Sequence, residues 1–284
     1  KGKKILEIGC GSGFLLRLFK KKKLDVFGIE PSNANNLKKL KIKKVFYSKA
    51  KYNHKFDIIT SNAVLEHEFK PDFFIKKSYK DLNYGGMIFI CIPDFTKLIK
   101  NGDPTLVNHE HVSYFTKANL KFYLMKNRFS KIKVFSDKYG NLYGGGFKEM
   151  QKIKFIKSNF VKNKRPDINY HKRFFSCVRK MNKWLKSEKK YNLGLYGATS
   201  SISTLFSQIK FDKKNIFIFD GDSQKQNKYI DSFPHPILDG KNISKKNIKK
   251  LIILPYFYEN EIKNNLMGKT KLKSLNIKSL SNFF

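Results

Sequence analysis

The first stretch that could do chemistry is a glycine-rich turn near the start of the sequence. Glu7-Ile8-Gly9-Cys10-Gly11-Ser12-Gly13 joins an apolar run, 4–8, to a helical pattern, 14–19. Glycine lets a backbone turn sharply and approach a ligand closely, and a strand that enters a helix through such a turn opens a nucleotide-binding unit. A second apolar run, 25–29, ends in Glu30, at a distance that suits a carboxylate binding ribose hydroxyls. These residues predict a site for a cofactor that contains a nucleoside.

The second stretch is His109-Glu110-His111, which lies beyond the last apolar run of the first half. Histidine titrates closest to neutrality, so His111 could act as a general base, with Glu110 holding and stabilising it. A metal site would need a third ligand, and His-Glu-His is not the HExxH pattern, so we predict no metal here. The alternative that the histidines only cap the loop and the next helix stays open.

Alternating segments must position these residues. Helix-like sequence, including a helix that starts at Pro31-Ser32-Asn33, separates apolar runs that predict strands at 4–8, 25–29, 45–47, 56–60 and 86–92. This alternation predicts a doubly wound α/β fold with a parallel sheet covered on both faces. We expect the first domain, 1–137, to be completed by an irregular loop at 97–108, a helix at 119–127 and a strand at 131–135.

The second half predicts a smaller α/β domain. Residues 138–191 predict a connecting strand and a helical arm, because apolar residues between 151 and 191 recur at mostly helical spacing. A strand at 193–198 then enters a glycine turn, with a helix at 202–209 behind it. A strand at 215–219 ends in Asp220, and 250–254 is another apolar strand. Residues 192–284 therefore predict a second Rossmann-like domain.

Composition narrows the class of protein. The chain has 284 residues, 59 of them Lys or Arg and 22 Asp or Glu, for a net charge of +37. Such a charge could attract nucleic acid, but arginine is the residue that grips phosphates and bases best, and only five arginines occur, Arg17, Arg128, Arg165, Arg173 and Arg179. The composition therefore disfavours nucleic acid as the partner.

The cysteines and the apolar runs indicate where the chain works. Cys10, Cys91 and Cys177 form no CxxC pair, which indicates neither a zinc knuckle nor a disulfide framework and fits a reducing cytoplasm. No apolar run reaches the roughly 18 residues of a membrane span, and no signal-peptide core opens the sequence. The sequence leaves the oligomeric state open.

The glycine turn closely resembles motif I of class I S-adenosylmethionine (SAM) dependent methyltransferases. Gly11-Ser12-Gly13-Phe14-Leu15-Leu16 lacks the third glycine of a dinucleotide-binding GxGxxG turn, and Asp57 to His67 is similar to the segment after strand four of these enzymes. The resemblance implies a class I methyltransferase fold and SAM as the cofactor. It also implies a cofactor site made of Glu7, Gly9, Cys10, Gly11, Gly13, Glu30 and Asn62.

Further segments resemble the sugar C-methyltransferase family over nearly the whole chain. They are 109–115, 143–148, the helical arm, 196–198, Asp220 with Lys225-Gln226, and 254–262. The resemblance implies methylation of a carbon in a keto-deoxysugar carried on a nucleoside diphosphate. It also implies that His111 is the base and Glu110 its partner. His109, Tyr114 and His67 are further candidates for the substrate pocket.

The chain departs from that family at three points. Asn108 stands where the family commonly has Tyr, and Thr199-Ser200-Ser201 stands where a basic residue often follows the Tyr-Gly-Ala turn. The family often carries a cysteine-rich zinc domain before motif I, and this sequence begins with Lys1, as a fragment without such a segment would.

Other readings of the same residues stay open. The base could equally serve a hydroxyl, which predicts an O-methyltransferase for a sugar or small molecule. The basic surface predicts an RNA methyltransferase as a third class. Asn108, Gly197 and Asp220 could contact the sugar nucleotide, since a glycine turn at a helix N-terminus can hold a pyrophosphate. A packing role for Gly197 and a turn cap for Asp220 are equally open.

Overall fold

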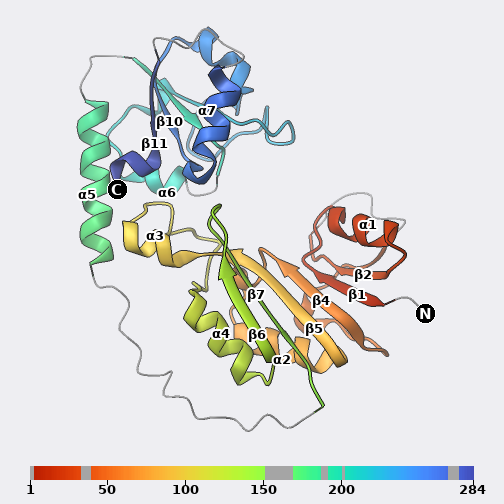
Figure 1. Cartoon of the computed structure of the whole chain (residues 1–284). Helices are drawn as coiled ribbons and strands as arrows, with labels where there is room; N and C mark the ends of the chain where they lie inside the picture. The colour runs from red at the N-terminus through yellow and green to blue at the C-terminus, as the bar shows by residue number, and fades with distance from the viewer. Residues whose placement is uncertain (1–2, 33–39, 151–168, 187–190, 200–201, 268–274) are drawn as a thin grey trace. The chain divides into compact units, whose positions relative to one another are not determined.

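The computed structural model describes residues 3–32, 40–150, 169–186, 191–199, 202–267 and 275–284. The chain divides into two compact units, each with its own sheet (Figure 1). The first comprises 1–96 and 109–164, and the second comprises 97–108 and 165–284. No helix in these described ranges is long and apolar enough to cross a membrane.

The first unit is built on a seven-stranded sheet of order β3-β2-β1-β4-β5-β7-β6. Strands β1 to β5 run parallel, and β7 is antiparallel to both β5 and β6. The strands are β1 Lys4–Ile8, β2 Asp25–Ile29, β3 Lys41–Lys43, β4 Phe56–Asn62, β5 Leu82–Pro93, β6 Ser130–Ser136 and β7 Asn141–Phe147. This sheet confirms the predicted class I methyltransferase fold.

Three helices in the described ranges pack against this sheet. The helices α1 (Phe14–Lys21), α2 (Pro71–Asp81) and α4 (Lys117–Lys126) pack against β2, β5 and the β6–β7 pair respectively. Helix α4 begins at a capping box, in which the Thr116 hydroxyl accepts from the Asn119 N–H and the Asn119 side chain accepts from the Thr116 N–H. Short 3₁₀ turns occupy η1 Tyr47–Lys49 and η2 Leu65–His67.

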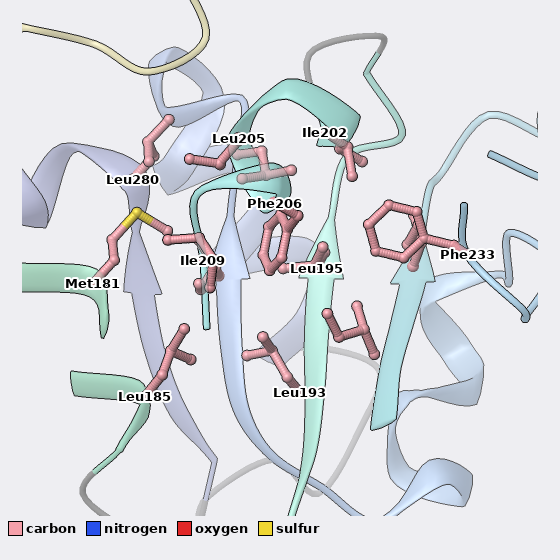
Figure 2. Close-up of a cluster of buried hydrophobic side chains, with 14 of the residues drawn as sticks. Met181, Leu185, Leu193, Leu195, Ile202, Leu205, Phe206, Ile209, Phe233 and Leu280 are labelled. Carbon is pink, nitrogen blue, oxygen red and sulfur yellow. The ribbon is translucent and has the colours of Figure 1, made fainter. Parts of the chain in front are cut away.

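The second unit holds a four-stranded parallel sheet of order β11-β10-β8-β9. Its core combines α5, β8, β10 and α6, and Figure 2 shows its aliphatic and aromatic side chains meeting over β8. The strands are β8 Asn192–Tyr196, β9 Ile216–Phe219, β10 Ile248–Ile253 and β11 Asn276–Ser279. The helices are α5 Tyr170–Leu185, α6 Ile202–Ser207 and α7 Glu259–Met267, with 3₁₀ turns η3 Lys213–Asn215, η4 Gly240–Lys246, η5 Tyr256–Tyr258 and η6 Leu280–Phe283.

One predicted strand was wrong. The third strand is Lys41–Lys43, whereas Tyr47 begins the 3₁₀ turn η1 instead of belonging to a strand at 45–47. The Tyr47 ring packs edge-on against Phe74 of α2 at 5.2 Å, and its hydroxyl donates to Asp81 at 3.0 Å. Tyr47 is thus buried by contact with a helix. A run of apolar residues in the sequence does not show whether such a contact or a strand buries them.

The segment predicted as an irregular loop at 97–108 also differs. Helix α3 spans Phe95–Asn101, and 97–108 belongs to the second unit. At Gly102 (φ +67°), an added Cβ would lie 2.4 Å from the Arg173 Cβ, so the backbone runs directly against α5. The Tyr170 hydroxyl also donates to the Asp103 carbonyl oxygen at 3.0 Å. These contacts with α5 order the segment.

The predicted boundaries differ from the two units elsewhere as well. Strand β7, expected in the connecting region, pairs with β5 and β6 and therefore belongs to the first sheet. Within the predicted arm, the structure shows α5, while 151–168 lies outside the described residues. The predicted helix after Pro31 likewise falls mostly on 33–39, outside the described residues.

Leu195 tests the core of the second unit. Its side chain is fully buried on β8 among the residues of Figure 2. Leu195→Ala should lower the free energy of unfolding by about 2 to 5 kcal/mol, because it removes buried methyl groups and leaves a cavity. Chemical denaturation followed by circular dichroism measures this change. Phe175→Ala, at a half-exposed position on α5, is the matched control and should change stability much less; equal losses would contradict the assigned core.

Candidate functional site

The glycine turn after β1 is bonded to the end of β2. The N–H groups of Gly9 and Cys10 both donate to the carbonyl oxygen of Ile29, at 2.8 and 3.0 Å. The Gly11 N–H donates to Oε2 of Glu30 at 2.7 Å. A carboxylate has about four acceptor positions, and Glu30 also accepts from Ser32, so it keeps capacity for a ribose hydroxyl. The two predicted parts of the cofactor site therefore lie together.

The turn needs glycine for two physical reasons. Gly9, Gly11 and Gly13 all have positive φ, at 70°, 47° and 71°, where other residues are strained. At Gly9 an added Cβ would also lie 2.3 Å from Cγ2 of Val64, which follows β4. The backbone of Gly9 therefore packs directly against Val64, in the segment after β4.

The carboxylates near the turn have opposite electrostatic environments. Burial alone would raise the pKa of Glu30, but hydrogen bonds from Ser32 and Gly11 lower it. Burial raises the pKa of Glu7 from its ordinary 4.5 to about 7, and the negative charge of Glu30 adds to that rise. Burial with Glu7 and Glu30 also raises the pKa of Cys10 to about 12, so the Cys10 thiol stays protonated. The turn therefore holds negative potential that suits a cationic ligand.

A pocket of about 600 Å³ opens beside this turn. Gly9 and Pro31 line it from the cofactor turn, and Val64 and His67 line it from the segment after β4. The exposed aromatic side chains of Phe46, Phe69 and Phe73 lie around it. Pockets of this size hold small molecules and cofactors. Asn62, the remaining predicted cofactor residue, is exposed at the end of β4.

His111 lies beside His67 and Glu66. The rings of His111 and His67 are 5.1 Å apart, and one ligand atom from each of Glu66, His67 and His111 lies within 4.8 Å of the other two. Glu66 is 1% exposed, and its Oε2, like Nδ1 of His111, is buried without a hydrogen-bond partner among the described residues. We call these three residues the Glu66–His67–His111 cluster; it could hold a metal ion.

Backbone hydrogen bonds hold the cluster in place. The carbonyl oxygen of Glu66 accepts from the N–H groups of Val112 and Ser113, both at 3.0 Å, and the Ser113 hydroxyl donates to the carbonyl oxygen of Glu68 at 3.0 Å. Nδ1 of His67 bonds to the carbonyl oxygen of Glu110 at 2.7 Å. The segment after β4 and the segment 110–113 are thus joined directly.

The cluster shifts the pKa of its members in opposite directions. Burial lowers the pKa of His111, and the neighbouring His67 lowers it further, while Glu110 opposes the change. Burial raises the pKa of Glu66, against the effect of its own N–H and of His67. Both shifts favour the uncharged forms of His111 and Glu66.

The charge of Glu110 acts on His111, whose pKa it raises against the effect of burial. The Glu110 carboxylate lies 4.0 Å from Nε2 of His109, and both side chains are largely exposed. Tyr114 is 37% exposed, and its ring contacts Phe95 at 4.9 Å. The buried acid in reach of His111 is Glu66, which the sequence analysis did not select. Its signal was its place directly after β4, at the edge where parallel sheets bind ligands.

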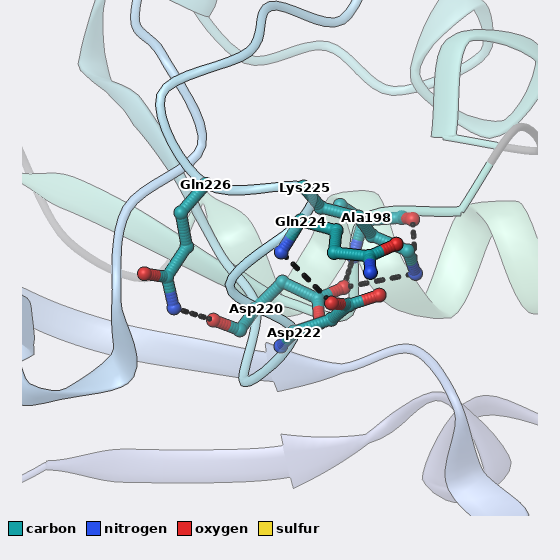
Figure 3. Close-up of polar contacts among 6 residues, drawn as sticks. All are labelled: Ala198, Asp220, Asp222, Gln224, Lys225 and Gln226. Carbon is teal, nitrogen blue, oxygen red and sulfur yellow. Dashed lines mark hydrogen bonds and ion pairs between the residues drawn. The ribbon is translucent and has the colours of Figure 1, made fainter. Parts of the chain in front are cut away.

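The three weaker substrate candidates, Asn108, Gly197 and Asp220, all belong to the second unit. In Figure 3, Asp220 Oδ2 accepts from the Ala198 N–H at 2.8 Å and lies 3.3 Å from the Lys225 ammonium. Gly197 has φ +101°, and an added Cβ would lie 2.5 Å from Cδ of Pro255. Both residues therefore have structural roles in closing this turn. The buried Asn108 lies in the segment 97–108.

Comparisons with known proteins assign both halves of the chain. Residues 1–133 match the family model of a methyltransferase domain, and 157–273 match that of a C-methyltransferase C-terminal domain. A curated relative, the ubiquinone biosynthesis O-methyltransferase of Pelagibacter ubique (strain HTCC1062), is 34% identical over 123 residues, which are 39% of this chain and 50% of the relative. The chain thus spans about half of that relative's length.

Solved structures similar to the chain cover about half of it. A SAM-dependent methyltransferase from Archaeoglobus fulgidus is 17% identical with a TM-score of 0.44, over 52% of this chain and 86% of that one. The 1,6-didemethyltoxoflavin-N1-methyltransferase of Burkholderia thailandensis, with bound S-adenosylhomocysteine, is 16% identical with a TM-score of 0.41, over 52% of this chain and 72% of that one.

The sheet order, the Gly9–Gly13 turn joined to Glu30 and the two family matches all lead to one assignment. They confirm the predicted fold, the cofactor SAM and the predicted resemblance to a methyltransferase with a C-methyltransferase C-terminal domain. The first half of the chain is therefore a SAM-dependent methyltransferase domain, and residues 157–273 match the model of a C-methyltransferase C-terminal domain.

Proposed function

We propose that this protein transfers the methyl group of SAM to a carbon of a nucleotide-linked keto-deoxysugar. The observation that carries the proposal is the union of a methyltransferase domain with a C-methyltransferase C-terminal domain in one chain. Three free cysteines and a nucleotide-linked substrate fit a reaction in the cytoplasm.

Carbon methylation places a clear demand on the site. A proton must leave the carbon next to the ketone, so that the resulting enolate carbon can attack the methyl group on the SAM sulfur. We assign this proton transfer to the Glu66–His67–His111 cluster. Support comes from the pocket, in which His67 and the turn residue Gly9 line the same cavity. Of the catalytic residues predicted from the sequence, His111 belongs to this cluster. Glu110 is the weaker candidate, because its carboxylate is exposed beside His109.

A second candidate function is O-methylation of a small hydroxyl compound. It is favoured by the 34% identity of this chain to an O-methyltransferase over 123 residues. The decisive experiment offers labelled SAM with a panel of nucleoside-diphosphate keto sugars, hydroxylated small molecules and RNA. Methyl on a sugar carbon, located by NMR, is the expected result. Methyl on oxygen would replace the proposal by the second candidate. Methyl on RNA would show that the protein is an RNA methyltransferase, whose basic surface would help it to bind RNA.

Glu30 tests the cofactor site. Glu30→Ala should weaken SAM binding by roughly tenfold or more, because it removes a charged acceptor of ribose hydrogen bonds. Isothermal titration calorimetry measures the affinity, and circular dichroism checks the fold. Asp220→Ala is the matched control, since Asp220 closes the equivalent turn of the second unit by accepting from Ala198. Unchanged SAM affinity in Glu30→Ala would show that the ribose acid is misassigned.

Glu7 predicts a pH dependence of SAM binding. Because its pKa is about 7, Glu7 is mostly protonated at pH 6 and mostly ionised at pH 8. SAM carries a sulfonium and an ammonium group, so affinity should rise with pH across this range, by about fivefold. Glu7→Gln should flatten the profile. The same raised pKa implies that the ligand-free protein loses stability as pH rises from 4.5 through 7.

This loss of stability gives Glu7 a second measurement. Glu7→Gln should unfold at a higher temperature than the unmodified protein at pH 8, and the difference should vanish below pH 4.5, the ordinary pKa of the group. Differential scanning calorimetry across pH measures it. A SAM affinity with the same pH profile in both proteins would contradict the role of Glu7.

His111 tests the acceptor side. His111→Ala should slow methyl transfer by about 10² to 10⁴, the usual contribution of a proton-transfer group, while SAM still binds. Single-turnover kinetics with labelled SAM measure the rate. His54→Ala is the control, because His54 packs against Phe27 at 4.8 Å and belongs to no candidate site. A rate for His111→Ala close to that of the control would remove His111 from the mechanism.

A further inference from the structure

We propose that Glu66, His67 and His111 bind a divalent transition-metal ion. The sequence predicted no metal, because His109-Glu110-His111 supplies no third ligand in a known pattern. The fold supplies a different set, in which two adjacent residues after β4 meet His111. Ion binding rests on these residues alone, whereas the use of the ion in catalysis rests on the proposed function.

The first argument is the tautomer of His67. A carbonyl oxygen only accepts, so the 2.7 Å bond between Nδ1 of His67 and the Glu110 carbonyl oxygen places the proton on Nδ1. Nε2 is then left with its lone pair. Histidines that bind metals usually donate their other ring N–H to a carboxylate or a backbone carbonyl in this way, which fixes the ring and raises its basicity.

The second argument is the cost of burying the other two groups. Oε2 of Glu66 and Nδ1 of His111 are buried without a hydrogen-bond partner in the described ranges, and the Glu66 side chain is almost completely buried. A buried carboxylate oxygen without a partner is expensive. One cation between the three side chains would accept a lone pair from each and neutralise the carboxylate. One ligand atom from each of the three side chains lies within 4.8 Å of the other two.

The third argument is the ligand set itself. Two imidazoles with one carboxylate suit Zn²⁺, Fe²⁺, Co²⁺ or Mn²⁺, whereas Ca²⁺ and Mg²⁺ prefer sites made of oxygen atoms. Three protein ligands leave at least one coordination position open, as in catalytic rather than structural zinc sites. The carbonyl of Glu66, bonded to the N–H groups of Val112 and Ser113, keeps the two ligand segments in register without the ion.

The ion would define how the cluster removes the proton. The ketone oxygen of the sugar would occupy an open position, and an ion-bound hydroxide would take the proton from the adjacent carbon and become water. The carbon–hydrogen electron pair forms the enolate, whose negative oxygen the ion stabilises. The enolate carbon then bonds to the methyl group as the methyl–sulfur bond breaks, leaving S-adenosylhomocysteine. In this form of the mechanism His111 acts as a ligand.

The test measures ion binding to the full chain, without SAM or substrate. After treatment with a chelator, the protein is titrated with Zn²⁺ by calorimetry and with Co²⁺ by absorption spectroscopy. We expect one ion per chain and a Co²⁺ spectrum with nitrogen ligands. Glu66→Gln should weaken binding at least about tenfold, and His111→Ala at least about a hundredfold. Absence of one-to-one binding by the unmodified protein would overturn the proposal.

Two controls separate the site from adventitious binding. His109→Ala removes an exposed histidine next to the cluster and should leave the affinity within about twofold of the unmodified protein, as should His54→Ala. If His109→Ala loses as much affinity as His111→Ala, the exposed His109–His111 pair binds the ion and the proposal fails. Retained SAM binding by each variant shows that a loss of ion binding does not come from unfolding.

A final measurement separates this proposal from the proposed function. Metal-free protein should methylate its acceptor at least about a hundredfold more slowly, and Zn²⁺ or Mn²⁺ should restore the rate. Full methyl transfer by protein shown to hold no ion would overturn the catalytic use of the ion and leave His111 as a free base. Tight one-to-one binding that depends on Glu66, together with failure to methylate any keto sugar, would support the ion site while the proposed function fails.

Discussion

The closure of a glycine turn by an acid from the neighbouring strand is the constraint on which the cofactor site depends. The N–H groups of Gly9, Cys10 and Gly11 all point at the end of β2, two of them at the Ile29 carbonyl and one at Glu30. A side chain at Gly9 would collide with Val64. The same turn therefore joins β1 to β2 and holds the segment after β4 against it, and this segment carries Glu66 and His67.

The second unit also has a turn closed by an acid from the neighbouring strand, but the surroundings of that acid differ. Asp220 at the end of β9 accepts from the Ala198 N–H of the turn after β8, as Glu30 accepts from Gly11. The Lys225 ammonium lies against Asp220, however, whereas Glu30 accepts hydrogen bonds from the uncharged groups of Gly11 and Ser32. A carboxylate that already has a cation has less acceptor strength for ligand hydroxyls. The two turns look alike in sequence and differ in the charge next to each acid.

Local sequence patterns predicted much of this fold because their physical causes are local. A buried parallel strand needs a continuous apolar run and a glycine turn needs residues that tolerate positive φ, so β1, β2, β4 and β5 were found with their turns. The strand expected at 45–47 was wrong because Tyr47 is buried by α2, an element far away in sequence. The helix α3 was missed because contacts with α5 order the segment 97–108 and no pattern within the segment reveals them.

The residues around His111 were likewise only partly predictable from the sequence. Adjacency in sequence favoured Glu110 as the partner of His111, but Glu110 lies in a turn beside His109. The Glu110 carboxylate is accordingly exposed beside His109, while its carbonyl oxygen is the group that holds His67. Glu66 reaches His111 from the end of β4 because its backbone carbonyl is bonded to Val112 and Ser113. Hydrogen bonds between segments more than forty residues apart therefore place the Glu66 carboxylate near His111. Its Oε2 is buried there without a hydrogen-bond partner among the described residues.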